Sequence, residues 1–182
     1  MPAYQKILEK KSNYPKELFR KYNQLKAQKV QVENQKIRKK AIQEIRRFSK
    51  YELKLVGAAL YWGEGYKSEK SGGDCVQLSN SDPYLVVLFL RFLREILKIP
   101  EEKFLVSIRV HPNIDEKDAI KFWSKATAIP KDRFRITRQI SRASEGKRPR
   151  NSLPYGTLDL RVNSRQNFFK IKGWIDGIIK NL

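Results

Sequence analysis

Residues 55–65 constrain the fold of this chain more than any other segment. Their sequence, LVGAALYWGEG, joins large apolar residues to three consecutive small ones, namely Gly57, Ala58 and Ala59. Ser49 and Glu52 have the spacing of a capping box, which predicts a helix that starts near Tyr51. Gly65 is a typical residue for ending such a helix. The small residues would let another backbone approach this helix closely.

Glu64 is the unusual residue of this segment. It falls in the last turn of the expected helix, between two glycines. A carboxylate at the negative end of a helix dipole is unfavourable. We therefore expect a cation to lie near Glu64, and a bound metal ion is the obvious candidate.

The charge of the chain indicates a polyanionic partner. Lys and Arg number 39 against 19 Asp and Glu, a net charge of +20. Such an excess is most often explained by nucleic acid.

One Cys and one His argue against a structural zinc site, so any metal should have oxygen ligands. There is no apolar run of membrane-spanning length and no signal peptide, which predicts a cytoplasmic protein, nucleoid-associated if it binds DNA.

The sequence predicts a basic helical extension over residues 1–48 and a second domain over residues 49–182. Residues 1–50 carry a net charge of +11, and residues 51–182 carry +9. Within the second domain, the helix that contains Glu64 is followed by a hairpin over 66–80 with its turn at 71–74. Asp82 and Pro83 begin a helix that ends before Pro100.

Alternating apolar and polar residues predict strands over 104–111, 133–140 and 156–163. A short helix around residues 120–126 lies between the first two, and a helix over 168–178 closes the chain. The expected class is therefore α+β, with the order α-β-β-α-β-α-β-β-α after the basic arm.

Residues 59–65, with the sequence ALYWGEG, resemble the second half of the motif helix of the LAGLIDADG homing endonucleases and their relatives. The core of that family is α-β-β-α-β-β-α with a curved antiparallel sheet. The resemblance extends over roughly residues 50–180, with one extra helix between the third and fourth strands. Glu64 falls on the metal-binding acid of the family. Trp62 is a departure, because the family often has a second acid there.

The resemblance implies a metal-dependent DNA endonuclease that uses Mg²⁺ or another divalent cation held by Glu64. The chain has one copy of the motif, so a pair of metal-binding acids implies a homodimer in which the helices pack through Gly57, Ala58 and Ala59. The family also uses a glutamine and a basic residue of the sheet to position water and phosphate. By strand placement, Gln77 and Arg161 are the candidates here.

The polar faces of the predicted strands have the composition of a DNA-reading surface. Arg pairs with guanine in the major groove, and Asn or Gln pairs with adenine. The candidates for DNA binding on this face are Arg109, Arg133, Arg135, Thr137, Gln139, Arg161 and Asn163. The basic loop over 141–155 adds Lys147, Arg148 and Arg150 as phosphate contacts, and its composition is equally typical of a disordered hairpin tip.

Two other functions are compatible with the sequence. Trp62 and the basic arm favour a regulator that binds specific DNA on the same fold without cutting it. The charge alone would also suit an RNA-binding or ribosome-associated protein.

Overall fold

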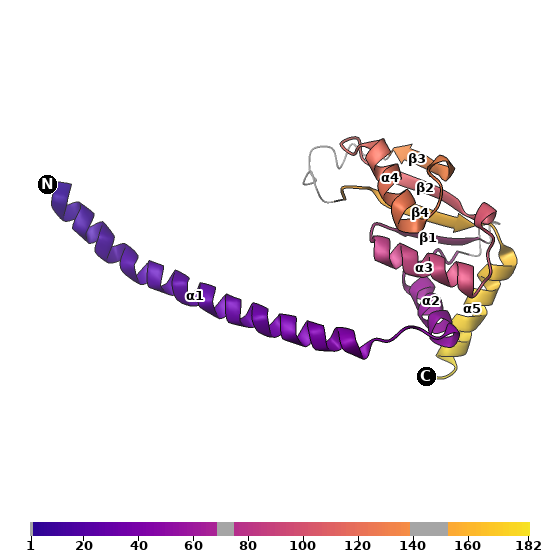
Figure 1. The fold of residues 1–182 in the computed structure, drawn as a ribbon, viewed down its shortest axis with the longest axis horizontal. Helices are drawn as coiled ribbons and strands as arrows, with labels where there is room; N and C mark the ends of the chain where they lie inside the picture. The colour runs from indigo at the N-terminus through magenta and orange to yellow at the C-terminus, as the bar shows by residue number, and fades with distance from the viewer. Residues whose placement is uncertain (1, 69–74, 139–152) are drawn as a thin grey trace. The chain divides into compact units, whose positions relative to one another are not determined.

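The computed structural model describes the backbone of residues 2–68, 75–138 and 153–182, and the side chains from Lys16 onward. It has an α+β architecture in which the chain divides into two compact units, residues 1–47 and residues 48–182. Figure 1 shows the elements of each unit. The predicted turn at 71–74 and the end of the predicted strand over 133–140 lie outside the described residues.

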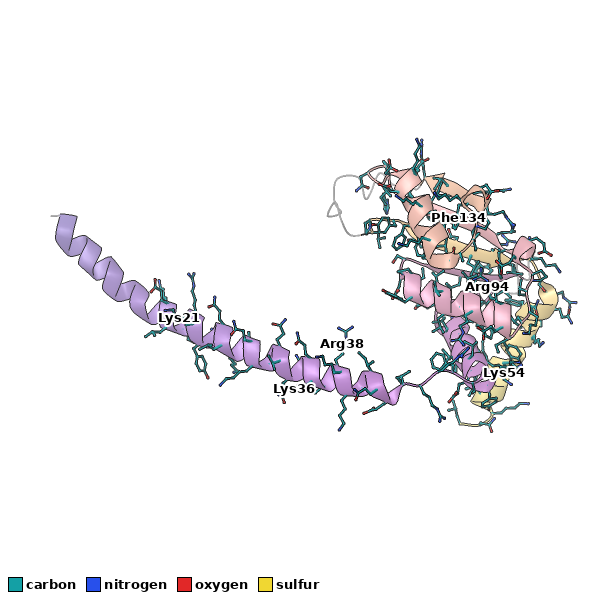
Figure 2. All side chains as sticks on the ribbon, in the orientation of Figure 1. Lys21, Lys36, Arg38, Lys54, Arg94 and Phe134 are labelled. Atoms are coloured by element: carbon teal, nitrogen blue, oxygen red, sulfur yellow. The ribbon has the colours of Figure 1, made fainter. Side chains whose placement is uncertain are left out.

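The first unit is one long helix, α1, which runs from Pro2 to Glu44. Each described side chain of α1, from Lys16 to Glu44, is exposed. Figure 2 shows Lys21, Lys36 and Arg38 extending from it. The described apolar side chains of α1 are exposed as well, among them Ile37 at 61%. None of the described helices is both long and apolar enough to cross a membrane.

The second unit contains a four-stranded mixed sheet. Its strands are β1 (Val76–Asn80), β2 (Leu105–Val110), β3 (Phe134–Arg138) and β4 (Thr157–Val162). They are ordered β1-β4-β2-β3. The last strand in sequence, β4, therefore lies inside the sheet and pairs antiparallel with both β1 and β2.

The prediction of a fully antiparallel sheet is wrong for β2 and β3, which are parallel. The helix α4 (Glu116–Thr127) lies between them in sequence. A helical crossover returns the chain to the end of the sheet where it started, so the next strand runs in the same direction as the last. The extra helix was predicted, but its effect on strand direction was not.

Within the described residues, the predicted hairpin over 66–80 consists of β1 and one bridge. Gly65 forms an isolated antiparallel bridge to Leu78, and the amide of Tyr66 donates to the carbonyl of Gln77 at 2.9 Å. Helix α2 (Lys50–Glu64) uses the residues up to Glu64, so little chain is left before the undescribed residues 69–74 to extend the pairing. The described sheet thus has one strand fewer than expected.

Four helices pack on one face of this sheet. They are α2, α3 (Pro83–Glu95), α4 and α5 (Arg165–Ile179), and short 3-10 turns at Glu101–Lys103 and Lys131–Arg133 precede β2 and β3. Alternate strand residues supply the other half of the core, among them Leu78, Ile108 and Leu160, each at most 1% exposed. The strand periodicity thus correctly predicted which face of the sheet is buried.

The local signals around α2 are confirmed. Ser49 is its N-cap, and the side chains of Ser49 and Glu52 form the predicted capping box. The helix ends at Gly65, whose φ of −80° is available to any residue. Glycine is required there for space, because a Cβ atom would lie 2.3 Å from the ring of Tyr61.

Gly57 allows close packing within the chain. It lies against α3, and a Cβ atom at Gly57 would be 2.1 Å from Cδ2 of the buried Phe92. Ala58 is also fully buried, whereas Ala59 is exposed. Of the three small residues predicted to meet a second chain, only Ala59 is exposed for that contact.

Substituting Gly57 with Ala is expected to destabilise the fold. Overpacking a core typically costs about 1–3 kcal/mol, and the better helix propensity of Ala returns up to about 1 kcal/mol. We expect a net loss of about 1–2 kcal/mol in the free energy of unfolding, measured by urea denaturation. Gly173→Ala is the matched control: Gly173 is exposed and nothing lies within 4 Å of its Cβ position, so this variant should be at least as stable as the wild type.

Candidate nucleic-acid interface

The face of the sheet opposite the helices is polar and partly exposed. Strand register places its side chains in rows across the strands. One row joins Gln77, Arg161 and Leu105, and the next joins Ser79, Asp159, Ser107 and Arg135. Arg109 lies between Thr157 and Thr137 in a third row. We call these residues the open face of the sheet.

The three residues predicted to be catalytic lie close together in the backbone framework. Glu64 is exposed at the end of α2, two residues before the amide that binds the carbonyl of Gln77. Arg161 is the register partner of Gln77 on β4, and its side chain is exposed. The end of the motif helix and one corner of the open face therefore meet at these residues.

Tyr61 fixes the end of α2 to the start of β1. Its side chain is fully buried and stacks on Phe89, with ring centroids 5.9 Å apart. Its hydroxyl donates to the carbonyl of Tyr66 and, at 3.4 Å, to that of Cys75. Burial raises the pKa of the Tyr61 phenol well above its ordinary value, which keeps the hydroxyl protonated as a donor.

A side chain of this chain supplies a cation at the end of α2. The ammonium of Lys67 donates to the carbonyl of Trp62 at 2.6 Å and contacts that of Gly63 at 3.5 Å. A lysine on the last carbonyls of a helix offsets the negative end of the dipole. The unfavourable position of Glu64 therefore does not by itself require a metal ion. The sequence already places a lysine three residues after Glu64, and its side chain is long enough to reach the last carbonyls of the helix. The metal ion was predicted without considering Lys67 as the cation.

The metal-ligand set in one chain is small. Among the described side chains, those of residues 16–68, 75–138 and 153–182, no three His, Cys, Asp or Glu residues come together as a metal site. Mg²⁺ is commonly held by one or two carboxylates, water and substrate phosphate. The exposed carboxylate of Glu64 has the oxygen chemistry of one such ligand.

The other predicted DNA-binding residues have different surroundings. Arg135 and Thr137 are exposed on β3 as expected. Asn163 follows β4, and its side-chain oxygen accepts from Nε of Arg161 at 2.8 Å. Gln139, Lys147, Arg148 and Arg150 lie outside the described residues.

Arg133 is not a strand residue of the open face. It lies in the 3-10 turn Lys131–Arg133, and its Nη2 donates to the carbonyls of Glu102 and Phe104, each at 3.0 Å. Pro130 precedes this turn, so the strand starts one residue later than predicted, at Phe134. Arg133 fixes the turn to the segment before β2.

Asp159 is the residue of the open face whose role the sequence did not reveal. It is half-buried on β4 and forms an ion pair with Arg109 of β2, with Ser79 of β1 also bonded to it. Strand alternation placed all three on one face. It could not show that Asp159 and Arg109, which come from different strands, meet diagonally across the sheet.

The outer side of α2 is apolar. Leu55 and Val56 are half-buried there, Trp62 is 40% exposed, and the neighbouring Leu60 packs against the core. Ala59 and Gly63 lie between these side chains at helical spacing, and both are exposed. This side of α2 has small residues where a second helix would come closest.

Comparison with protein-family models, with curated proteins and with solved structures gives no match for this chain.

Proposed function

We propose that this protein binds duplex DNA on the open face of its sheet and, as a homodimer, cuts it in a metal-dependent reaction at Glu64. The observation that carries the proposal is the backbone pairing around Gln77, which bonds to Tyr66 two residues after Glu64 and pairs in register with Arg161. One exposed acid, one amide and one guanidinium are the groups that phosphodiester cleavage by the LAGLIDADG-like route needs. The resemblance of residues 59–65 to that family and the net charge of +20 support the same conclusion.

Each of the three side chains has a distinct task in this proposal. Glu64 provides the anionic oxygen ligand of the metal site. Arg161 is exposed, and its guanidinium suits a phosphate oxygen of the DNA backbone. Gln77 can orient the attacking water by donating and accepting a hydrogen bond. Mg²⁺ bound at Glu64 would stabilise the charge that develops on the scissile phosphate.

Dimerisation follows from the same proposal. The apolar outer side of α2, with Ala59 and Gly63 exposed, suits close packing against the same helix of a second copy. The twofold axis would then pass between the two α2 helices. This arrangement gives one Glu64 to each strand of the DNA.

The direct test uses the full-length protein and a duplex library that contains the sequences around its own gene. We expect double-strand cleavage with Mg²⁺ and none with EDTA, and stronger retention of duplex DNA than of structured RNA at equal salt. Absence of cleavage together with specific DNA retention would leave only the binding part of the proposal. Stronger retention of RNA would overturn the proposal altogether.

The second candidate is a DNA-binding regulator that does not cut. The observation that favours it is the contact of the Lys67 ammonium with the carbonyls of Trp62 and Gly63, because this cation occupies the end of α2. In that case Mg²⁺ should change neither the DNA product nor the affinity. The regulator would still need the open face and the dimer.

Helix α1 is expected to strengthen DNA binding without regard to sequence. Lys29, Lys36 and Lys40 share one side of α1 at helical spacing and are exposed. Affinity falls as salt rises, and changing all three lysines to Gln should make this dependence less steep. The magnitude of the slope of log affinity against log salt should decrease by up to about 2.7, about 0.9 for each phosphate that a lysine no longer neutralises. The matched control is the exposed lysine row of α4, Lys117, Lys121 and Lys125. An equal effect of both triple variants would mean that α1 makes no special contact.

A further inference from the structure

The open face carries one carboxylate among the described residues of its strands, and this group holds an arginine. Asp159 of β4 is 14% exposed in its side chain, and Arg109 of β2 is 37% exposed. Nε of Arg109 donates to Oδ2 of Asp159 at 3.1 Å, and Nη2 donates to Oδ1. The hydroxyl of Ser79 also donates to Oδ1. The guanidinium is therefore held across the centre of the sheet by Asp159, and Ser79 of a third strand bonds to Asp159 in turn.

The contact with Asp159 uses one edge of the guanidinium and leaves another available. A guanidinium has five N–H groups, and Asp159 takes one from Nε and one from Nη2. Within the part of the chain that the structure describes, Nη1 donates no hydrogen bond. The second Nη2 hydrogen has only Ser79 Oγ at 3.4 Å, longer than an ordinary N–H···O bond. The N–H groups on the edge formed by Nη1 and Nη2 can thus donate two parallel hydrogen bonds to a new partner.

Charge decides which partner suits this edge. Asp159 neutralises Arg109 at close range, so the pair attracts phosphate much less than a lone arginine does. The hydrogen-bond geometry remains, and two parallel N–H donors match O6 and N7 of guanine in the major groove. Holding the side chain in advance also lowers the entropy lost on binding.

We propose that Arg109 reads one guanine in the major groove through its Nη1 and Nη2 atoms, with Asp159 as the positioning residue. This inference rests on the proposed DNA binding and adds the base that the centre of the open face recognises. It predicts that the pair contributes to specificity and little to overall affinity.

The test first selects the preferred duplex for the full-length wild type at a fixed salt concentration, then replaces each guanine of that duplex in turn with 7-deazaguanine, which lacks N7. One guanine, or a symmetric pair in a dimer site, should show a loss of affinity of about 5-fold or more, the lower end of what a bidentate base contact contributes. Arg109→Lys keeps the charge but not the fork, so it should lose the preference at that position alone. Asp159→Asn should weaken the same preference to a smaller extent.

Arg135→Lys is the matched control, because Arg135 is an exposed arginine of the same face on β3. It should retain the preference for guanine at the position that Arg109→Lys loses. If Arg109→Lys binds all sequences with the wild-type pattern, or binds all of them more weakly by the same factor, Arg109 does not read a base and the inference is wrong.

If Asp159→Asn fails to fold in a thermal melt, the 7-deazaguanine scan with the wild type and Arg109→Lys still decides the question. Failure of the wild type to bind any duplex would instead refute the proposed function, and this inference with it.

Discussion

Glu64→Gln is expected to abolish cleavage of duplex DNA and to leave the fold and the DNA affinity almost unchanged. Glu64 is exposed, and its side chain forms no hydrogen bond or ion pair within the described residues, so its loss should change stability by less than about 0.5 kcal/mol. Cleavage should fall by at least about 100-fold, because the amide cannot replace an anionic ligand where negative charge develops on the phosphate.

The measurement is a plasmid-cleavage time course with Mg²⁺ at several protein concentrations, beside a binding titration in EDTA. Glu102→Gln is the matched control: it removes the same charge from an exposed residue of the 3-10 turn before β2. Cleavage by Glu64→Gln at the wild-type rate would show that Glu64 holds no catalytic metal. Loss of DNA binding by Glu64→Gln would assign this residue to recognition instead of catalysis.

Local signals were predicted correctly because their causes lie within a few residues. The capping box of Ser49 and Glu52 and the Asp82 cap of α3 depend on hydrogen bonds to the next turn. Strand alternation is equally local, so the buried and open faces of β2 and β4 followed from it. This is why the composition of the open face could be predicted before its geometry was known.

The features that the sequence did not predict depend on parts of the chain that are far apart. The diagonal contact between Arg109 and Asp159 exists because β4 lies between β1 and β2, an order that no local pattern specifies. The burial of Gly57 depends on the ring of Phe92, which α3 brings to it. The same small residue would have suited a contact between two chains, and the sequence offers no means of choosing between these neighbours.

The packing of Gly57 against Phe92 restricts which side of α2 a second copy can contact. With Gly57 and Ala58 buried within the chain, a second copy can approach α2 closely only on the side that bears Ala59 and Gly63. Gly63 is the better site for a test, since nothing lies within 4 Å of its Cβ position and a larger side chain fits a single chain. A substitution there separates folding from association.

Gly63→Leu is therefore expected to give a stable monomer. Replacing glycine within a helix should stabilise the single chain by up to about 1 kcal/mol. In the dimer the added side chain meets its symmetry mate, and an overpacking cost of about 1–3 kcal/mol from each copy would weaken association by roughly 30-fold or more. Sedimentation equilibrium across a range of concentrations measures this change, and double-strand cleavage should decline in parallel.

Gly173→Leu provides the control on α5, because Gly173 is also exposed and also has nothing within 4 Å of its Cβ position. It should dimerise like the wild type. If Gly173→Leu dissociates and Gly63→Leu does not, the two copies meet through α5, and the two Glu64 carboxylates need not approach each other. A shared metal site at Glu64 would then have no structural basis, and the regulator would become the better explanation of the open face.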